Sequence, residues 1–298
     1  MYKRQEEGRA RALDAAARAQ GTVLGAAARR FVVDEMAERA AGLAFYALFS
    51  SIPIVVIAAA LFGLVGDQDT VDSLTKSASD AGASSSVADV LRSLLGTAIA
   101  GSPESASTVG LVGLGTLIYG ASKSFTDAGR SLDRISGGRV VPRSLRKRAT
   151  DLVWTVVLIL FGLLAAAILF VTGDLLRVVL DAIGLDDVKS VVWEIARWPL
   201  IAGVALLAVG LVRWAGPTSG GGSFRPFRPG ALMTVALWVA ATAGYSVYLG
   251  TFARYNATYG TFSALVILML WIWAACVAFL YGAELDQVLE QRRVDSRG

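Results

Sequence analysis

The sequence predicts an all-α integral membrane protein, a bundle of six transmembrane helices with amphipathic external helices. The 298-residue chain is 55% hydrophobic and only 17% charged, whereas soluble domains carry about 25% charged residues. Its apolar residues also gather in long uncharged runs, of which residues 262–283 are the clearest. This run of 22 residues makes about 33 Å of helix, which matches a hydrocarbon core of roughly 30 Å.

Five further uncharged runs bring the expected number of spans to six. They are residues 40–66, 105–122, 152–173, 198–212 and 229–253. The run of 15 residues at 198–212 reaches only about 22 Å as a helix. That helix must therefore either thin the bilayer or draw residues 193–197 into it.

The basic residues predict the orientation of the spans. The N-terminal segment, the connections after the second and fourth runs and the C-terminal tail hold 21 of the 28 Lys and Arg residues. The three alternate connections hold five, and the connections at 67–104 and 174–187 contain ten Asp and Glu. Because basic residues in short loops stay in the cytoplasm, both termini are expected to be cytoplasmic.

We divide the chain into three parts on these grounds. Residues 1–39 form a cytoplasmic or interfacial helical segment, residues 40–285 the six-helix transmembrane domain, and residues 286–298 a cytoplasmic tail. Residues 86–101 and 174–185 carry apolar side chains at helical spacing, which predicts amphipathic helices outside the membrane. Such helices either rest on the bilayer and cap the bundle or act as lids over a cavity.

Composition excludes several kinds of site. There is no histidine, and Cys276 is the only cysteine. Internal disulfides, Ser-His-Asp and Cys-His nucleophiles and His-ligated zinc or haem are therefore excluded. The sequence also has no phosphate-binding loop and no acidic metal cluster on its expected cytoplasmic side. We expect no enzymatic activity, no cofactor and no metal.

The basic balance of the chain predicts contact with lipid. The pI is about 9.3, but the basic residues lie in loops between spans, so no nucleic acid partner is expected. Residues 139–148, RVVPRSLRKR, are the densest basic cluster. They set the topology and contact anionic head groups, each charge contributing about 1 kcal/mol.

Small residues recur at a spacing of four in the last two expected spans. They are Ala236, Ala240 and Gly244 in one, and Ala274, Ala278 and Gly282 in the other. Such stripes let helix backbones approach closely where lipid supplies no hydrophobic drive. We predict that these two helices pack together; alternatively, the stripes serve a homo-oligomer.

The first candidates for a polar cavity are Glu194 and Arg197 in the short fourth span. They stand three residues apart on one helical face, just before the helix-disturbing Pro199 and between two tryptophans. They form either an interfacial ion pair anchored by those tryptophans or a charged pair that lines a cavity.

The second group of cavity candidates is Tyr46, Ser50, Ser51 and Pro53 in the first span. Pro53 has no N–H, so the carbonyl of Phe49 loses its helical partner. Either a serine hydroxyl satisfies the freed backbone group, or the helix breaks there beside a substrate route.

Three further positions are structural or interface candidates. Lys123 is expected to snorkel to the membrane surface. Glu284 is interpreted as the edge of the last span, with a basic partner within residues 123–148. Asn256 is expected to cap the turn between the last two spans.

Four motifs carry a resemblance to a known family. AFYALFSSIPIVV (44–56), FRPGALMTVALW (227–238), YNATYGTFSALVILMLWIW (255–273) and GAEL (282–285) together resemble the YihY family, also called virulence factor BrkB. The resemblance covers about residues 30 to 290 and implies six spans in the bacterial inner membrane, but no particular activity. Some members have been called ribonuclease BN, a name that the residues here do not support. The motif positions matched are Tyr46, Ser50, Pro53, Gly230, Asn256, Tyr259, Gly260, Gly282 and Glu284.

Three function classes remain, of which an enzyme is the least favoured because the sequence offers no catalytic cluster. A transporter or exporter of a lipid or small molecule fits the kinked first span, the intramembrane charges and the amphipathic external segments. A non-transporting membrane scaffold that binds partners through residues 139–148 or through its small-residue stripes is the alternative. The first class requires a water-accessible route through the bundle, and the second does not.

Overall fold

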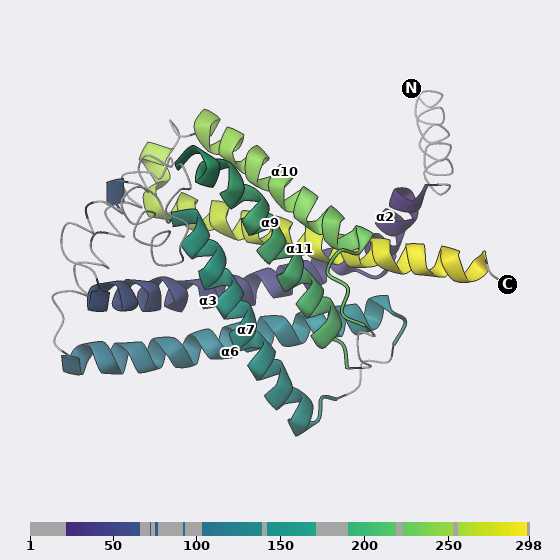
Figure 1. The fold of residues 1–298 in the computed structure, drawn as a ribbon, viewed down its shortest axis with the longest axis horizontal. Helices are drawn as coiled ribbons and strands as arrows, with labels where there is room; N and C mark the ends of the chain where they lie inside the picture. The colour runs from purple at the N-terminus through teal and green to yellow at the C-terminus, as the bar shows by residue number, and fades with distance from the viewer. Residues whose placement is uncertain are drawn as a thin grey trace. The chain divides into compact units, whose positions relative to one another are not determined.

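The computed structural model describes residues 22–65, 72, 75–76, 92, 103–138, 142–170, 190–218, 223–252 and 256–296. Within these residues it contains helices and no strand (Figure 1). The helices are α2 (Val23–Val33), α3 (Met36–Val65), α6 (Pro103–Ile135), α7 (Leu145–Phe170), α9 (Ser190–Ala215), α10 (Pro229–Phe252) and α11 (Asn256–Asp295). Most of the expected external amphipathic helices and the first 21 residues of the N-terminal segment lie outside the described residues.

Each of the six uncharged runs falls on a separate helix, from α3 to α11 in chain order. Three described helical segments are long and apolar enough to cross a membrane: Leu145–Ala166, Ile195–Ala215 and Leu268–Asp295. The fourth run is shorter than its helix, because α9 begins at Ser190 and has 26 residues. Residues 193–197 are thus part of this helix; their position relative to the bilayer stays a prediction.

The helix ends have local causes. The Thr22 hydroxyl accepts from the amide of Gly25 at 3.1 Å, which caps the start of α2. Asp34 caps its end, and the positive φ of 57° at Glu35 turns the chain into α3. At the other terminus, α11 continues past its apolar run to Asp295, since the segment ELDQVLEQRR is rich in good helix formers.

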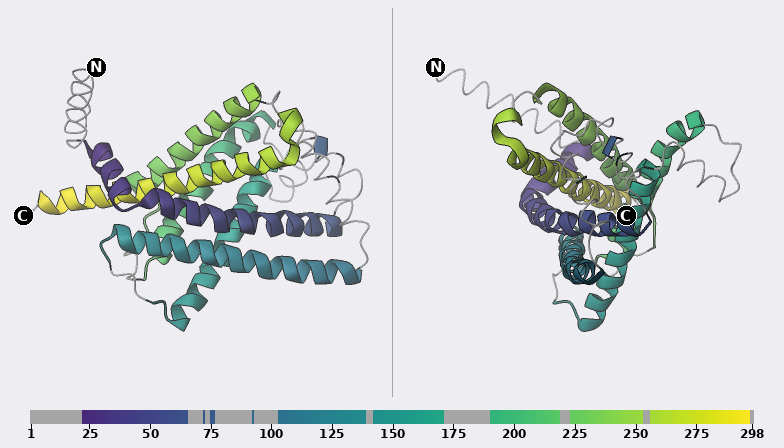
Figure 2. Two further views of the ribbon diagram at one scale, coloured as in Figure 1. Left: turned by 180° about the vertical axis from the view of Figure 1, so that it is seen from behind. Right: turned by 90° about the vertical axis from the view of Figure 1, so that its left-hand side faces the viewer.

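The chain forms two compact units. Unit 1 comprises Met1–Ala41, Phe125–Thr242 and Ala274–Gly298, and unit 2 comprises Gly42–Ser124 and Ala243–Trp273. In unit 1, α7 and α9 pack together, and α2 lies against the C-terminal part of α11 (Figure 2). Buried Ala27, Leu285 and Val288 form the core of the contact between α2 and α11.

The packing of α10 on α11 confirms one prediction and corrects its details. The indole N–H of Trp238 donates to the carbonyl of Ala275 at 2.8 Å, and the Thr234 hydroxyl to that of Ala278 at 3.3 Å. Ala236 and Ala240, which were expected to face α11, are exposed. The expected face of α10 was therefore wrong, because polar side chains that hydrogen-bond to α11 select the contact instead of the alanines.

The same contact requires two glycines. A Cβ atom on Gly230 would overlap the carbonyl oxygen of Gly282, and a Cβ on Gly282 would overlap that of Gly230. Both glycines are buried. On α11, Ala278 is also buried, so its predicted small-residue stripe does face α10.

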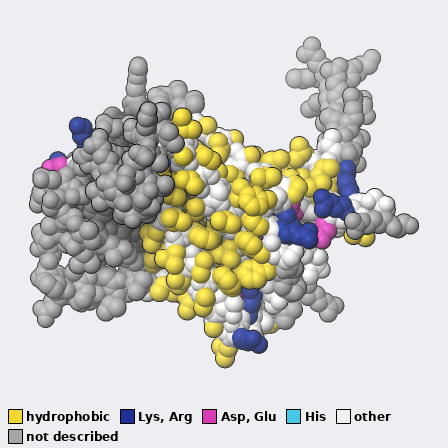
Figure 3. Space-filling model, viewed as in Figure 1, with side chains coloured by type: hydrophobic (Ala, Val, Ile, Leu, Met, Phe, Trp, Pro, Cys, Tyr) yellow, Lys and Arg dark blue, Asp and Glu magenta, His cyan; other side chains and the backbone are white. Residues whose placement is uncertain are grey.

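The surface of unit 1 is divided by polarity. Apolar side chains cover the face formed by α7, α9 and α10, whereas Lys and Arg gather near α2, the end of α11 and the start of α7 (Figure 3). Val153, Val156, Leu160 and Leu164 of α7 are all exposed. A contiguous apolar surface of this kind is the pattern of helices that contact lipid.

Candidate functional site

The charged residues of unit 1 form buried ion pairs near the helix ends, beginning with Arg213 and Asp286. Arg213 Nη1 lies 2.6 Å from Asp286 Oδ2, and the two side chains are only 12% and 11% exposed. The second oxygen of Asp286 accepts from the amide of Gly230 at 2.7 Å. That amide is one of the free donors at the start of α10, so a carboxylate is well placed there.

The same arginine also joins the three helices. Its Nη2 donates to the carbonyls of Gly230 and Phe279, both at 3.3 Å, and to the Thr234 hydroxyl at 3.2 Å. Because Gly230 and Gly282 approach each other closely, these acceptors lie together around the Arg213 guanidinium. Arg213 and Asp286 therefore fix the end of α9 to the crossing of α10 and α11.

Glu284 forms the second buried ion pair. Its side chain is fully buried, and its Oε2 lies 3.2 Å from Arg30 Nε. Arg30 also donates to Gln291 Oε1 at 2.7 Å and to the carbonyl of Ile135 at 3.2 Å. Thus Arg30 connects α2 to α11 and to the end of α6.

This pair corrects the partner that the sequence analysis assigned to Glu284. A basic residue within 123–148 was expected, but the structure provides Arg30 instead. The reason is that α2 folds back along α11 through Ala27 and Val288, which brings an arginine from the opposite end of the chain to Glu284.

The third group fixes the segment before α7 to the end of α9. Asp151 is buried and pairs with both Arg143 and Lys147, at 2.9 Å from Lys147 Nζ. Arg143 also donates to the carbonyl of Gly216 at 2.9 Å, and Lys147 to that of Ala215 at 2.5 Å. Two cations therefore lie at the C-terminus of α9, where the helix dipole favours positive charge.

This arrangement changes what the basic cluster at 139–148 can contact. Arg143 is buried, and its charge is balanced within the protein by Asp151. Arg146 and Arg148 are exposed and remain the described members of the cluster that can meet head groups.

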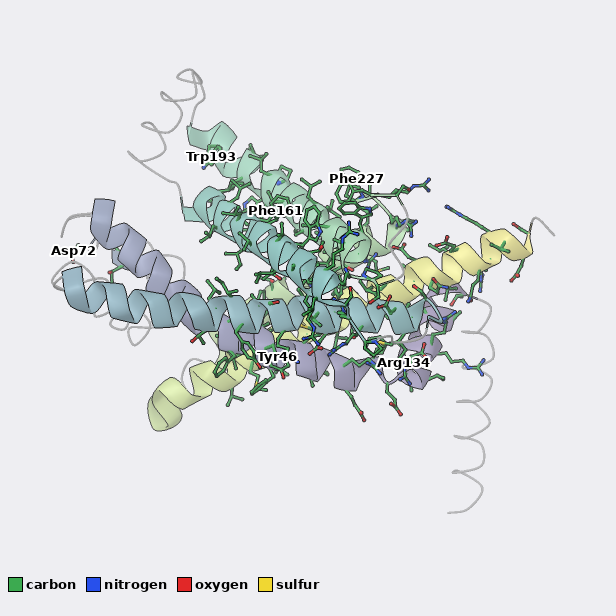
Figure 4. The ribbon with its side chains drawn as sticks, turned by 90° about the horizontal axis from the view of Figure 1, so that it is seen from below. Tyr46, Asp72, Arg134, Phe161, Trp193 and Phe227 are labelled. Atoms are coloured by element: carbon green, nitrogen blue, oxygen red, sulfur yellow. The ribbon has the colours of Figure 1, made fainter. Side chains whose placement is uncertain are left out.

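In unit 2 the structure brings together Tyr46, Ser50 and Lys123. The buried Ser50 hydroxyl donates to the carbonyl of Tyr46 at 2.7 Å, and the Lys123 amine lies 5.7 Å from the centre of the Tyr46 ring (Figure 4). Gly120 of α6 faces Ser50 so closely that a Cβ atom would overlap its hydroxyl. A hydroxyl, a phenol and an amine therefore share the contact of α3 with α6.

The hydrogen bond of Ser50 differs from the one considered for Pro53. Its hydroxyl donates to Tyr46, not to the carbonyl of Phe49 that Pro53 leaves without its helical partner. Helix α3 continues through Pro53 as one element from Met36 to Val65.

Comparison with known proteins places the chain in a family. The family model described as virulence factor BrkB matches residues 27–298. The chain belongs to this family. The resemblance found in the motifs is thereby confirmed.

The relatives of this BrkB family protein carry two kinds of name. The ribonuclease-like protein YfkH of Bacillus subtilis is 25% identical over 268 residues, which cover 89% of this chain and 94% of YfkH. A UPF0761 membrane protein of Xanthomonas oryzae pv. oryzae is 49% identical over 57 residues, but these cover 19% of this chain and 13% of that protein. No solved structure matches the chain. The membrane name agrees with the apolar helices found here.

Several predicted site positions in this BrkB family protein lie outside the described side chains. They are Ser51, Pro53, Glu194, Asn256, Tyr259 and Gly260. The pairing of Glu194 with Arg197 therefore stays a prediction; the Arg197 guanidinium lies 5.5 Å from the ring of Trp198. Asn256 is the first residue of α11. Among the described residues, no group of three or more His, Cys, Asp or Glu side chains could hold a metal ion.

Most of the ion-pairing residues were not predicted from the sequence. Asp151, Arg213 and Asp286 stand within three residues of the end of an uncharged run. Their position was a usable signal, because a charge at the end of a span either meets water or needs a partner. Their partners come from distant segments, which sequence order does not reveal.

Proposed function

We propose that this BrkB family protein is a multi-pass transporter of the bacterial inner membrane that exports a lipid or another small molecule. It crosses the membrane six times, and both termini lie in the cytoplasm. The observation that carries the proposal is the polar group of Tyr46, Ser50 and Lys123 in unit 2.

Placing these polar side chains in a membrane span is energetically unfavourable. Helix α3 has an apolar sequence over most of its length, yet it turns a hydroxyl and a phenol toward α6. In the described part of the chain, Lys123 has the Tyr46 ring beside it and no ion pair. Lys123 directly follows the uncharged run 105–122, so we place it at the mouth of a route for a substrate or an ion, where ionisable groups beside spans are functional candidates. A cation beside a phenol suits a substrate with an anionic or polar head group.

A membrane scaffold is the second candidate, supported by unit 1. There the ion pairs of Asp151, Glu284 and Asp286 hold helix ends together, which favours a rigid body. Exposed Arg146 and Arg148 would bind anionic head groups and anchor the protein or a homo-oligomer of it at the cytoplasmic leaflet. No nucleic acid partner is proposed.

Cysteine accessibility distinguishes the two functions. Cys276 is replaced by Ala, and Tyr46→Cys is compared with Phe49→Cys, a neighbouring α3 position that is 48% exposed and expected to face lipid. A membrane-impermeant maleimide is added to intact cells and to inverted vesicles. A transport route predicts rapid labelling of Tyr46→Cys and little labelling of Phe49→Cys, because a thiol in hydrocarbon does not ionise.

The control is a cysteine at exposed Arg148, which must be labelled in the inverted vesicles. If Arg148→Cys reacts and Tyr46→Cys does not, water does not reach this part of α3. The transport proposal then fails, and the scaffold is favoured.

A further inference from the structure

The junction of α2 with α11 contains a buried carboxylate without a hydrogen-bond donor. Glu284 is fully buried, and neither of its oxygens has a hydrogen-bond partner among the described residues. Arg30 Nε lies 3.2 Å from Oε2 but is not aligned to donate to it. Asp34, the C-cap of α2, stands one helical turn after Arg30 on the same face, and its charge disfavours ionised Glu284.

The charges at this junction do not balance. Arg30 pairs with Glu284 alone, while its Nη1 and Nη2 donate to Gln291 and to the carbonyl of Ile135, so Asp34 adds a second carboxyl group to this end of α2. Two ionised carboxylates can only accept hydrogen bonds, so neither can donate to the other. Their like charges also repel each other. A proton on Glu284 removes one negative charge and supplies the missing donor.

We propose that Glu284 retains a proton, and that this proton holds α2 against α11 and the end of α6. The proton lies on a carboxyl oxygen of Glu284, which can then donate toward the carboxylate of Asp34. When it leaves, both groups are ionised, and Asp34 at the end of α2 is pushed away from Glu284. The proton therefore determines whether α2 is docked.

The other charges nearby do not change this balance. The charged groups that act on Glu284 are Arg30 and Asp34. From α6 the junction receives the carbonyl of Ile135. On α11 itself, Asp286 is paired with Arg213. Glu284 directly follows the uncharged run 262–283 and lies within the apolar helical segment Leu268–Asp295. The inference does not rest on the transport proposal.

Infrared difference spectroscopy of the full chain in lipid nanodiscs tests the proposal, because the C=O stretch of a protonated carboxyl group is observed directly. An ordinary Glu titrates at about pH 4.3, so a band that persists well above that pH identifies a retained proton. We expect this band in the unmodified protein and its loss in Glu284→Gln. Glu290→Gln is the matched control, because Glu290 is a carboxylate of the same helix that is 62% exposed.

Two further variants move the titration in opposite directions. Asp34→Asn removes the repelling charge and offers an amide donor to ionised Glu284, so the midpoint of the band moves to lower pH. Arg30→Gln removes the cation that favours ionised Glu284, so the midpoint moves to higher pH. Glu290→Gln leaves it unchanged.

Docking of α2 is measured separately, by the distance between spin labels at Val32→Cys and Glu290→Cys in a Cys276→Ala protein. Both positions are exposed, and the distance should increase above the titration midpoint. Identical difference spectra for the unmodified protein and Glu284→Gln would overturn the proposal. If Glu284→Gln does not fold, shifts of the same sign in Asp34→Asn and Arg30→Gln would overturn it equally. Labelling of Tyr46→Cys is read independently, so this inference and the transport proposal can fail separately.

Discussion

Replacing Asp286 by alanine should strongly destabilise this protein. The carboxylate lies 2.6 Å from Arg213 Nη1 in a site where both side chains are nearly buried. At an effective dielectric constant of about 20, that distance gives an attraction of about 6 kcal/mol. Desolvation of the two ions offsets much of it, but removal of one partner leaves the other buried and unpaired, which costs about 3–5 kcal/mol. The Gly230 amide also loses its acceptor.

Glu290→Ala is the matched control for Asp286→Ala. Glu290 is one turn further along α11, 3.7 Å from Arg228, in a pair that is 36% and 62% exposed. Exposed pairs of this kind contribute about 0–1 kcal/mol. The free energy of unfolding is measured by circular dichroism as sodium dodecyl sulfate is added to mixed micelles. A difference between the two variants below about 1 kcal/mol would refute the assignment of Asp286 as a buried partner.

The double variant Arg213→Met with Asp286→Ala adds a test of mechanism. Met replaces the guanidinium with an apolar side chain of similar length, so the double variant no longer buries an unpaired charge. We expect it to be more stable than Asp286→Ala alone. Strictly additive losses would show that the two residues do not interact.

Two other predictions concern packing and topology. Gly282→Ala should lower the free energy of unfolding by about 1–3 kcal/mol, because its Cβ would meet the backbone of Gly230. The control is Gly162→Ala on α7, which should change the free energy of unfolding little, since a Cβ there meets nothing within 4 Å. Equal effects of the two substitutions would contradict the packing of α10 on α11. Arg148→Cys in a Cys276→Ala protein should react with an impermeant maleimide in inverted vesicles and not in intact cells. Labelling in intact cells would reverse the predicted orientation.

The helices could be predicted from the sequence because their signal is local. A run without charges that is long enough to cross the bilayer can be read from composition alone, and each of the six runs falls on one helix. The fourth run was cut short at Arg197, although α9 begins at Ser190. A charge-free criterion cannot extend past a charged residue, even one whose guanidinium stacks beside a tryptophan as Arg197 does.

The contacts between helices could not be predicted in the same way. The three small residues spaced by four on α10 offered one face to α11, but Thr234 and Trp238 select another through hydrogen bonds to α11 carbonyls. The partner of Glu284 was also not predictable from spacing. Which of the many arginines reaches it depends on α2 folding back along α11, a property of the folded chain.

The balance of charge separates structural polar groups from functional candidates. Arg213 and Asp286 neutralise each other, and the surplus cation beside Asp151 meets the C-terminal carbonyls of α9. Helix ends and opposite charges thus account for these groups without any ligand.

Two described sites are not balanced in this way. At one, the buried Glu284 lies beside Arg30 but has no hydrogen-bond donor among the described residues. At the other, Lys123 has an aromatic ring beside it but no ion pair among the described residues. A proton or a cation stabilises a surplus buried carboxylate, and an anion or a polar head group stabilises an unpaired cation. Function in this protein should therefore be sought at Glu284 and Lys123 before the ion pairs that hold the helices together.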